Sequence, residues 1–257
     1  MRVIKPSAEE IIQKNLFEHI EICGRTCYKS ADKITEGSAE KFVKMLIKNN
    51  HGSVLEHGTV YLVVPFGEEY TEYNFLKLLN NKYTKHKEFA NNYYITTNYR
   101  VIVENDFFNL MSKYQTEPTE HHYRRRTFKM VCNRSTSHEF VRHRVMSISQ
   151  ESQRYVNYGK TKFGKHIKFI KPLYFDETSK EYMLWKINCI DSEDIYMRLL
   201  SYGCTPQEAR EVLPNSTATE LVMTGFESEW VNFFDLRCSK SAHPQAVEVA
   251  NMVWKIF

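Results

Sequence analysis

The sequence predicts an α+β fold: a single domain with a mixed or antiparallel sheet and several long helices. Stretches with helical spacing and stretches rich in β-branched residues are interspersed, without the regular strand–helix–strand order of a parallel sheet. Hydrophobic residues make up 42% of the 257 positions and charged residues 26%, an ordinary balance for a globular protein. No repeat, low-complexity segment or linker divides the chain, so we expect one domain over residues 1–257.

The first part of the chain predicts two helices followed by a strand. Residues 7–23 carry apolar side chains at helical spacing, and Ser7 and Glu10 have the spacing of a capping box at the start of that helix. A second helix is expected over residues 38–49. Residues 59–66 are rich in β-branched and aromatic side chains, which is typical of a strand.

The middle of the chain is less regular, and residues 70–126 form an extended region of the expected domain. Residues 73–79 predict a short helix and residues 98–104 a strand, and a polar stretch then ends in HHYRRR at 121–126. We interpret that run as a solvated loop rather than a ligand site. Adjacent histidines rarely chelate one metal together, and no carboxylate lies at a useful offset.

The second half returns to clear patterns. Strands are expected over residues 127–133, 167–172 and 217–226, and helices over 135–145, 179–203, 205–214, 227–238 and 243–257. Gly203 ends the longest of these helices. Thr205 and Glu208 then give the next helix a capping box, with Pro206 in its first turn.

Charge and cysteine content narrow the function classes. The net charge of +4 suits an anionic small molecule better than a long nucleic-acid duplex. The N-terminal residues lack an apolar signal region, and no apolar run reaches the roughly 18 residues of a membrane span. We therefore expect a cytoplasmic protein without a membrane partner. The six cysteines lack disulfide or zinc spacing, so reduced thiols and no metal site are expected.

Several enzyme motifs are excluded. His51 and His57 flank Glu56, but Gly52 interrupts the stretch and the two histidines lie too far apart for the zinc-protease pattern. No phosphate-binding loop, dinucleotide fingerprint or nucleophile elbow occurs in the chain.

A cluster of cations in RHRVMSISQESQR is the strongest chemical signal. Arg142, His143 and Arg144 are adjacent, and Ser152 and Arg154 follow closely. Adjacent cations repel one another, so the cluster adds little to fold stability. Guanidinium groups, however, bind phosphate through two parallel hydrogen bonds. The alternative interpretation is a solvated basic face.

Two later arginines support the ligand interpretation. Arg210 lies early in one predicted helix and Arg237 late in another. With neutral side chains such as Gln150 and Asn232, they offer cations for phosphate together with donors and acceptors for the edge of a heterocycle.

The motif has a counterpart in a known family. Arg142-His143-Arg144, seven residues and then Ser152 give the pattern RHR-x7-S, which resembles the signature of the flavin-dependent thymidylate synthases. GRTCYKS, HGSVLEHGTV, AREVLP and NFFDLRCSKSAHPQ resemble other segments of that family in the same order. The likeness covers most of the chain, and residues 70–126 are longer than the family pattern. Phe226 and Ser228 depart from it, because many members have Asn-x-Arg there.

The resemblance implies an activity and a set of site residues. The activity is reductive methylation of dUMP to dTMP, with methylenetetrahydrofolate as carbon donor and FAD, reduced by NADPH, as hydride source. The resemblance also implies a homotetramer whose sites are shared between subunits, and no metal. The residues it places at FAD are His57, Thr59, Arg142, His143, Arg144, Phe226, Ser228 and Asn232. The residues it places at dUMP are Glu139, Arg142, Gln150, Glu151, Ser152, Gln153, Arg154, Arg210 and Arg237.

Arg237 is the implied catalytic residue, because a permanent cation stabilises negative charge that develops on the uracil ring. The alternative function is a nucleic-acid-binding module without enzymatic activity, which combines basic and aromatic residues. Such a module accounts for the cation cluster but not for five matching segments in order, so we expect no nucleic-acid partner.

Overall fold

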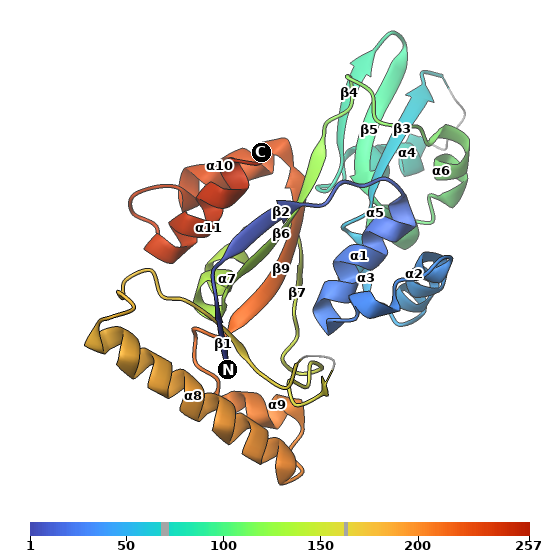
Figure 1. The fold of residues 1–257 in the computed structure, drawn as a ribbon. Helices are drawn as coiled ribbons and strands as arrows, with labels where there is room; N and C mark the ends of the chain where they lie inside the picture. The colour runs from blue at the N-terminus through green and yellow to red at the C-terminus, as the bar shows by residue number, and fades with distance from the viewer. Residues whose placement is uncertain (68–71, 162–163) are drawn as a thin grey trace.

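The computed structural model describes residues 1–67, 72–161 and 164–257 (Figure 1). Within these residues the strands form three sheets, and helices lie on both sides of the largest one. Both larger sheets are entirely antiparallel, so the α+β prediction is confirmed. One helix is long, α8 (Lys180–Ser201). None of the described helices combines the length and the apolar character that crossing a membrane requires.

The central sheet has four strands. Their order across the sheet is β2 (Ser7–Glu10), β6 (Arg125–Asn133), β9 (Ala218–Phe226) and β7 (Ser147–Gln150). β6 and β9 pair over nine positions, from Arg125 opposite Phe226 to Asn133 opposite Ala218. Nine residues are also the full length of each strand, so the two strands pair along their whole length at the centre of the sheet.

Helices sandwich the central sheet. Figure 1 shows α10 (Glu227–Arg237) and α11 (Pro244–Trp254) on one side and α1 (Leu16–Tyr28) on the other. Trp230 and Phe233 of α10 are fully buried against the sheet. Burying a large apolar side chain stabilises the fold by about 1.5–3 kcal/mol, so this contact fixes α10 against the strands.

Two strands of the extended region join β3 (Thr59–Pro65) in a second sheet, which has its own core. The strands are β3, β5 (Asn92–Asn98) and β4 (Lys85–Phe89), and the nearby helices are α2 (Ser38–Lys48), α3 (Gly52–Leu55), α4 (Glu72–Leu79), α5 (Tyr99–Glu104) and α6 (Phe108–Tyr114). Leu46, Leu62, Ile95 and Ile102 are fully buried in one cluster. This cluster is separate from the core beneath α10.

A third, small sheet lies beside the long helix. β1 (Arg2–Ile4) and β8 (Lys168–Ile170) pair in parallel. After α8 the chain forms α9 (Pro206–Ala209) and the short 3-10 helix η3 (Arg210–Val212), and the capping box predicted at Thr205 is present.

Two sequence predictions of secondary structure are wrong. Ser7–Glu10 form β2 rather than the first turn of a helix, because they pair with β6 at the edge of the central sheet. The helix begins at Leu16 instead, where the Asn15 side chain accepts hydrogen bonds from two backbone N–H groups. Residues 98–104 were predicted to be a strand, yet the Asn98 side chain accepts from Val101 N–H and caps helix α5.

Other predictions differ only in their limits. The helix predicted over 135–145 is α7 (Arg134–Phe140), so Arg142 and Arg144 lie in the turn that follows it. The predicted helices over 38–49, 179–203, 227–238 and 243–257, and the predicted strands over 59–66, 127–133 and 217–226, are all present.

Candidate active site

The RHR-x7-S segment is fastened to the end of α1. The Ser152 backbone N–H donates to the Cys27 carbonyl at 2.9 Å. Glu151 is buried and accepts from the Tyr158 hydroxyl at 2.6 Å, and Lys29 Nζ lies 3.0 Å from its other oxygen. Two segments that the sequence singled out separately, GRTCYKS and the signature, are therefore neighbours in space.

Three predicted site residues form a compact cluster. Arg237 donates through Nη1 to a Glu139 carboxylate oxygen at 2.8 Å and through Nη2 to the Glu139 carbonyl at 2.7 Å. Its Nε donates to His143 Nε2 at 2.9 Å. All donor-bearing nitrogens of this guanidinium are thus engaged, and its planar orientation is fixed.

His143 is held neutral in this cluster. Burial, and then the nearby Arg237 cation, lower the pKa of His143 to about 4. Its Nε2 accepts from Arg237 and so carries a lone pair, and the proton of the neutral ring lies on Nδ1. The ring also packs against Phe233, with centroids 4.8 Å apart.

The remaining cations of the signature face solvent. Arg142 and Arg144 are exposed, and none of the described carboxylates lies within ion-pair distance of either. Val145 follows them at φ = 77°, a conformation that a β-branched residue rarely adopts. A strained turn therefore presents two guanidinium groups without acidic partners.

Arg154 and Arg210 are exposed further along the molecule. Arg154 Nε donates to the Gln207 side chain at 3.3 Å, which connects the end of the signature to α9. Arg210 lies 3.6 Å from Glu211, and its side chain is 36% exposed. An ion pair at such exposure is weak, so both guanidinium groups remain available to an anionic ligand.

His57 and Thr59 have their polar groups turned inward. His57 is fully buried, and its ring nitrogens lie 2.7 Å from Thr224 Oγ1 and 2.9 Å from Ser149 Oγ. Thr59 Oγ1 accepts from Arg125 at 3.2 Å. Contact of these two residues with FAD stays a prediction, and the His57 ring has no free nitrogen for it.

The predicted FAD residues of β9 and α10 meet a lysine from the extended region. Lys85 Nζ lies 2.5 Å from Ser228 Oγ and 4.7 Å from the centroid of the Phe226 ring. Phe226 is buried, whereas Asn232 is exposed on α10. A cation thus stands beside the position at which the family pattern often has arginine, and sequence reasoning did not find it.

Glu139 and Gln150 have different partners. Glu139 binds Arg237, whereas the Gln150 amide donates to Ser137 Oγ at 2.8 Å and to Thr219 Oγ1 at 3.2 Å. Gln153 is half-buried in the turn after Ser152.

The solvated-loop interpretation of HHYRRR holds for Tyr123 and Arg124, which are exposed outside any helix or strand, and is wrong for His122 and for residues 125–126. His122 is buried, its Nε2 bonds to the Leu62 carbonyl at 3.1 Å, and its Nδ1 accepts from Thr119 N–H at 3.0 Å. Arg125 and Arg126 belong to β6, where Arg126 binds both carboxylate oxygens of Glu10. The run was interpreted as polar and exposed because its pairing with distant strands is invisible in the local sequence.

Two large cavities lie beside α1. The first, of about 800 Å³, lies between α1 and strands β2, β6 and β9 of the central sheet, and the second, of about 790 Å³, lies where β3 meets β6. Of the predicted site residues only Thr59 lines either cavity. Neither cavity therefore brings the predicted residues together.

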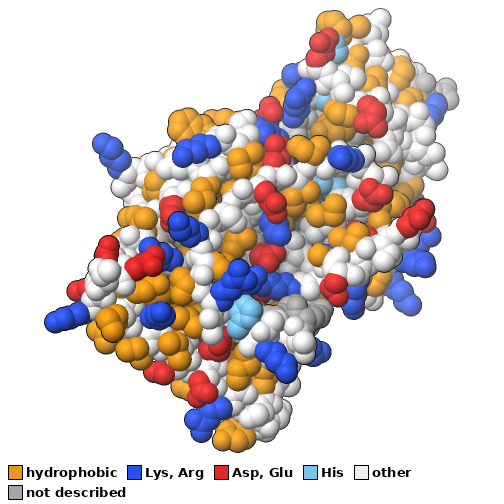
Figure 2. Space-filling model, viewed as in Figure 1, with side chains coloured by type: hydrophobic (Ala, Val, Ile, Leu, Met, Phe, Trp, Pro, Cys, Tyr) orange, Lys and Arg blue, Asp and Glu red, His pale blue; other side chains and the backbone are white. Residues whose placement is uncertain are grey.

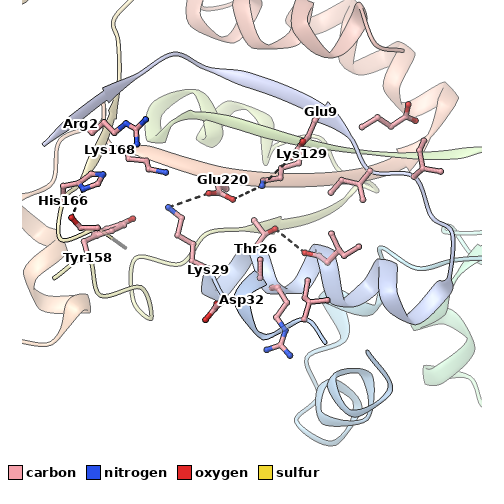
Figure 3. A pocket seen from close by; sticks show the side chains of 18 of the residues that line it. Arg2, Glu9, Thr26, Lys29, Asp32, Lys129, Tyr158, His166, Lys168 and Glu220 are labelled. Carbon is pink, nitrogen blue, oxygen red and sulfur yellow. Dashed lines mark hydrogen bonds and ion pairs between the residues drawn. The ribbon is translucent and has the colours of Figure 1, made fainter. Parts of the chain in front are cut away.

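The first cavity is lined by charges of both signs (Figure 3). Glu220 lies between two lysines, 3.7 Å from Lys29 Nζ and 3.2 Å from Lys129 Nζ. At the other end, Arg2 and Lys168 are cross-strand partners. Lys29 lies in the GRTCYKS segment, which was the sequence signal for this region. The other residues that line this cavity are brought together by strand pairing that the sequence did not predict.

The structure offers no metal-binding group among residues 1–67, 72–161 and 164–257. All six cysteines are free. Figure 2 shows cationic and anionic side chains interspersed over the visible face, without a broad basic surface of the kind that nucleic-acid-binding modules present.

Comparisons with known proteins agree on one family. The family model described as thymidylate synthase complementing protein matches residues 80–257. The flavin-dependent thymidylate synthase of Geobacter sulfurreducens is 34% identical over 125 residues, which are 47% of this chain and 52% of that protein. That of Pyrobaculum aerophilum is 35% identical over 133 residues, 51% and 47% of the two chains. The chain spans about half the length of the curated relatives it matches.

A solved structure is also similar. The UMP/dUMP methylase PolB from Streptomyces cacaoi, crystallised with 5-Br dUMP, is 17% identical with a TM-score of 0.48. The likeness covers 100% of this chain and 91% of that one.

Proposed function

Because this chain belongs to the family of thymidylate synthase complementing proteins, we propose that it converts dUMP to dTMP by reductive methylation. Methylenetetrahydrofolate supplies the carbon and NADPH the reducing equivalents. FAD, when bound, transfers the hydride from NADPH. The observation that carries the proposal is the presentation of Arg142 and Arg144 on a strained turn, without acidic partners among the described residues, beside the Arg237 cluster.

The exposed side chains fit phosphate-bearing ligands. Arg142 and Arg144 extend into solvent and are free to pair with the phosphates of FAD or of dUMP. Ser152 binds dUMP rather than attacking it. Its hydroxyl accepts from the Arg154 backbone N–H at 3.3 Å, and no described histidine or carboxylate hydrogen-bonds to it and acts as a base.

Arg237 is the catalytic cation of the proposed site. Glu139 and His143 hold its guanidinium plane before substrate arrives, which reduces reorganisation during the reaction. A neutral His143 accepts a hydrogen bond from Arg237 without adding a competing positive charge. The fixed guanidinium then stabilises negative charge on the pyrimidine when its C5 becomes nucleophilic.

The assembly is proposed to be a homotetramer with shared sites. Met183, Leu184 and Ile187 of α8 are 58%, 69% and 52% exposed, and Ile190 continues the same helical spacing. Exposed apolar stripes of this kind are typical of association surfaces. A second copy of the chain is the partner we assign to α8. The dispersal of the signature cations around one chain is consistent with sites that neighbouring copies complete.

The direct test is product formation. Purified protein is incubated with FAD, dUMP, methylenetetrahydrofolate and NADPH, and nucleotides are separated by chromatography. We expect dTMP only in the complete mixture, and flavin absorbance in the supernatant after the purified protein is denatured. A protein that carries no flavin, forms no dTMP and binds oligonucleotides would support the nucleic-acid-binding alternative instead.

A further inference from the structure

A continuous chain of hydrogen bonds crosses the centre of the molecule. His19 Nε2 lies 3.0 Å from Thr127 Oγ1, which lies 2.7 Å from Thr224 Oγ1. Thr224 Oγ1 lies 2.7 Å from His57 Nδ1, and His57 Nε2 lies 2.9 Å from Ser149 Oγ. The five side chains come from α1, β6, β9, the turn before β3, and β7. We call this set, His19, Thr127, Thr224, His57 and Ser149, the polar chain.

The polar chain is sealed from solvent along its length. His57 and Thr224 are fully buried, and His19, Ser149 and Thr127 are 2%, 3% and 4% exposed. Thr127 and Thr224 are direct cross-strand partners in the β6–β9 ladder. Buried hydrogen-bonded groups polarise one another strongly, because water does not compete for their donors and acceptors.

Each member of the polar chain can both donate and accept. A hydroxyl has one proton and two lone pairs, and a neutral imidazole has one N–H and one lone pair. Burial is the main cause that lowers the pKa of His19 to about 4 and that of His57 well below its ordinary value. Arg125 lowers both further, so both rings are neutral near pH 7.

Because both rings are neutral, the hydrogen bonds of the polar chain can all run in either of two donor-to-acceptor directions. If His57 Nδ1 carries the proton, it donates to Thr224, which donates to Thr127 and so on to His19. If His57 Nε2 carries the proton, every bond runs the other way, from His19 toward Ser149. Reversal requires each ring to change tautomer and each hydroxyl to turn, so the five groups switch together.

The two ends of the polar chain lie at different points along α1, on the face of the sheet that α1 covers. His19 and Thr127 line the second cavity, of about 790 Å³, which is large enough to admit water. His19 Nδ1 is buried and has no hydrogen-bond partner among the described residues, so at this end of the polar chain it is the nitrogen that remains open to a proton from the cavity that His19 lines. At the far end, Ser149 lies within the signature segment itself, close to the Cys27 thiol, and Cys27 is partly exposed.

We propose that the polar chain is a proton relay from the second cavity to the signature segment. The role rests on the proposed function, whose balance requires a proton. dTMP has one carbon and two hydrogens more than dUMP. Conversion of methylenetetrahydrofolate to tetrahydrofolate supplies the carbon but neither hydrogen. Two hydrogens must therefore enter, the hydride of NADPH and one proton from solvent.

The relay moves that proton without any redox step. A proton from the cavity binds His19 Nδ1, and the Nε2 proton of His19 passes to Thr127. The hydroxyl proton of Thr127 then passes to Thr224, that of Thr224 to His57 Nδ1, and the Nε2 proton of His57 to Ser149. Ser149 releases its hydroxyl proton toward Cys27, so one proton enters, one leaves and each group regains its charge.

A first experiment tests the coupling without any catalytic assay. The protein is labelled with ¹⁵N-histidine, and the His57 ring shifts report its tautomer. Among the described residues Thr127 is linked to His57 through Thr224 and makes no direct hydrogen bond to it, yet Thr127→Val should change the His57 tautomer ratio. Thr96→Val is the control, because Thr96 is equally buried and its hydroxyl has no hydrogen-bond partner. An unchanged His57 tautomer in Thr127→Val would show that the groups do not act as one chain.

A second experiment tests the proton transfer itself. In single-turnover dTMP formation, Thr224→Val should be at least about tenfold slower and should show a changed solvent isotope effect. Thr224→Ser restores a hydroxyl and should recover the rate, which excludes a general folding defect. Thr96→Val should match the wild type. A wild-type rate in Thr224→Val overturns the relay, whereas an inactive wild type overturns the proposed function and leaves the tautomer result intact.

Discussion

Acid should destabilise this protein through His19, and the size of the effect follows from its burial. Burial, followed by the Arg125 cation, lowers the pKa of His19 from 6.5 to about 4. The folded chain keeps the ring neutral in this range, whereas the unfolded chain protonates it below the ordinary pKa. Unfolding therefore takes up a proton between these two values, and the free energy of unfolding falls as the pH falls through them.

The magnitude is measurable. A pKa that falls from 6.5 to about 4 corresponds to at most about 3.5 kcal/mol, since each unit is worth about 1.4 kcal/mol. Most of the loss falls between pH 7 and pH 5, where the contribution of His19 alone changes by about 2 kcal/mol. Two kcal/mol is a large part of the roughly 5–15 kcal/mol that stabilises a typical domain.

The assay is urea unfolding at pH 7, 6 and 5, followed by tryptophan fluorescence at constant protein concentration. His19→Gln removes the titrating group, so the fall in stability should be shallower by about 2 kcal/mol than in the wild type. His51→Gln is the matched control, because His51 is exposed and makes no side-chain capping bond. If the free energy of unfolding fell equally with pH in wild type and in His19→Gln, His19 would not be the group that causes the loss.

Three further outcomes are expected. Arg237→Lys should lower dTMP turnover by about 10²–10³-fold with flavin content unchanged, because an ammonium cannot replace the planar fork, and near-normal turnover removes Arg237 from catalysis. Gly24→Ala should destabilise the fold by about 1–3 kcal/mol in urea, because its Cβ would lie 2.6 Å from Val54 Cγ1, and unchanged stability contradicts that packing. The double variant Leu184→Glu and Ile187→Glu should reduce the mass measured by light scattering, and an unchanged mass excludes α8 as the interface.

The sequence predicted the elements whose local signals agree with their tertiary surroundings. The apolar composition of residues 217–226 and the capping box at Thr205 both correspond to what the structure contains. The capping box at Ser7 failed because its residues gain more from pairing with β6 than from a helical turn. Residues 98–104 failed because β-branched composition outweighed the cap at Asn98 in the prediction.

The sequence predicted a set of site residues but not how they are arranged in space. Nothing local indicates that Arg237 reaches back to Glu139 and His143, because that contact depends on how α10 packs against the sheet. The sequence contains even less indication of the polar chain. His19 is one of several buried polar residues of α1, and its bond to Thr127 spans 108 positions.

The proposed function requires this chain to activate C5 of dUMP and to replace its hydrogen with a methyl group. The most direct measurement is release of tritium into water from dUMP labelled at C5, with FAD, methylenetetrahydrofolate and NADPH present. We expect tritium release that requires all three compounds, equals the amount of dTMP formed, and falls by about 10²–10³-fold in Arg237→Lys. Tritium retained in dUMP by a flavin-loaded wild-type protein would contradict the proposed activity.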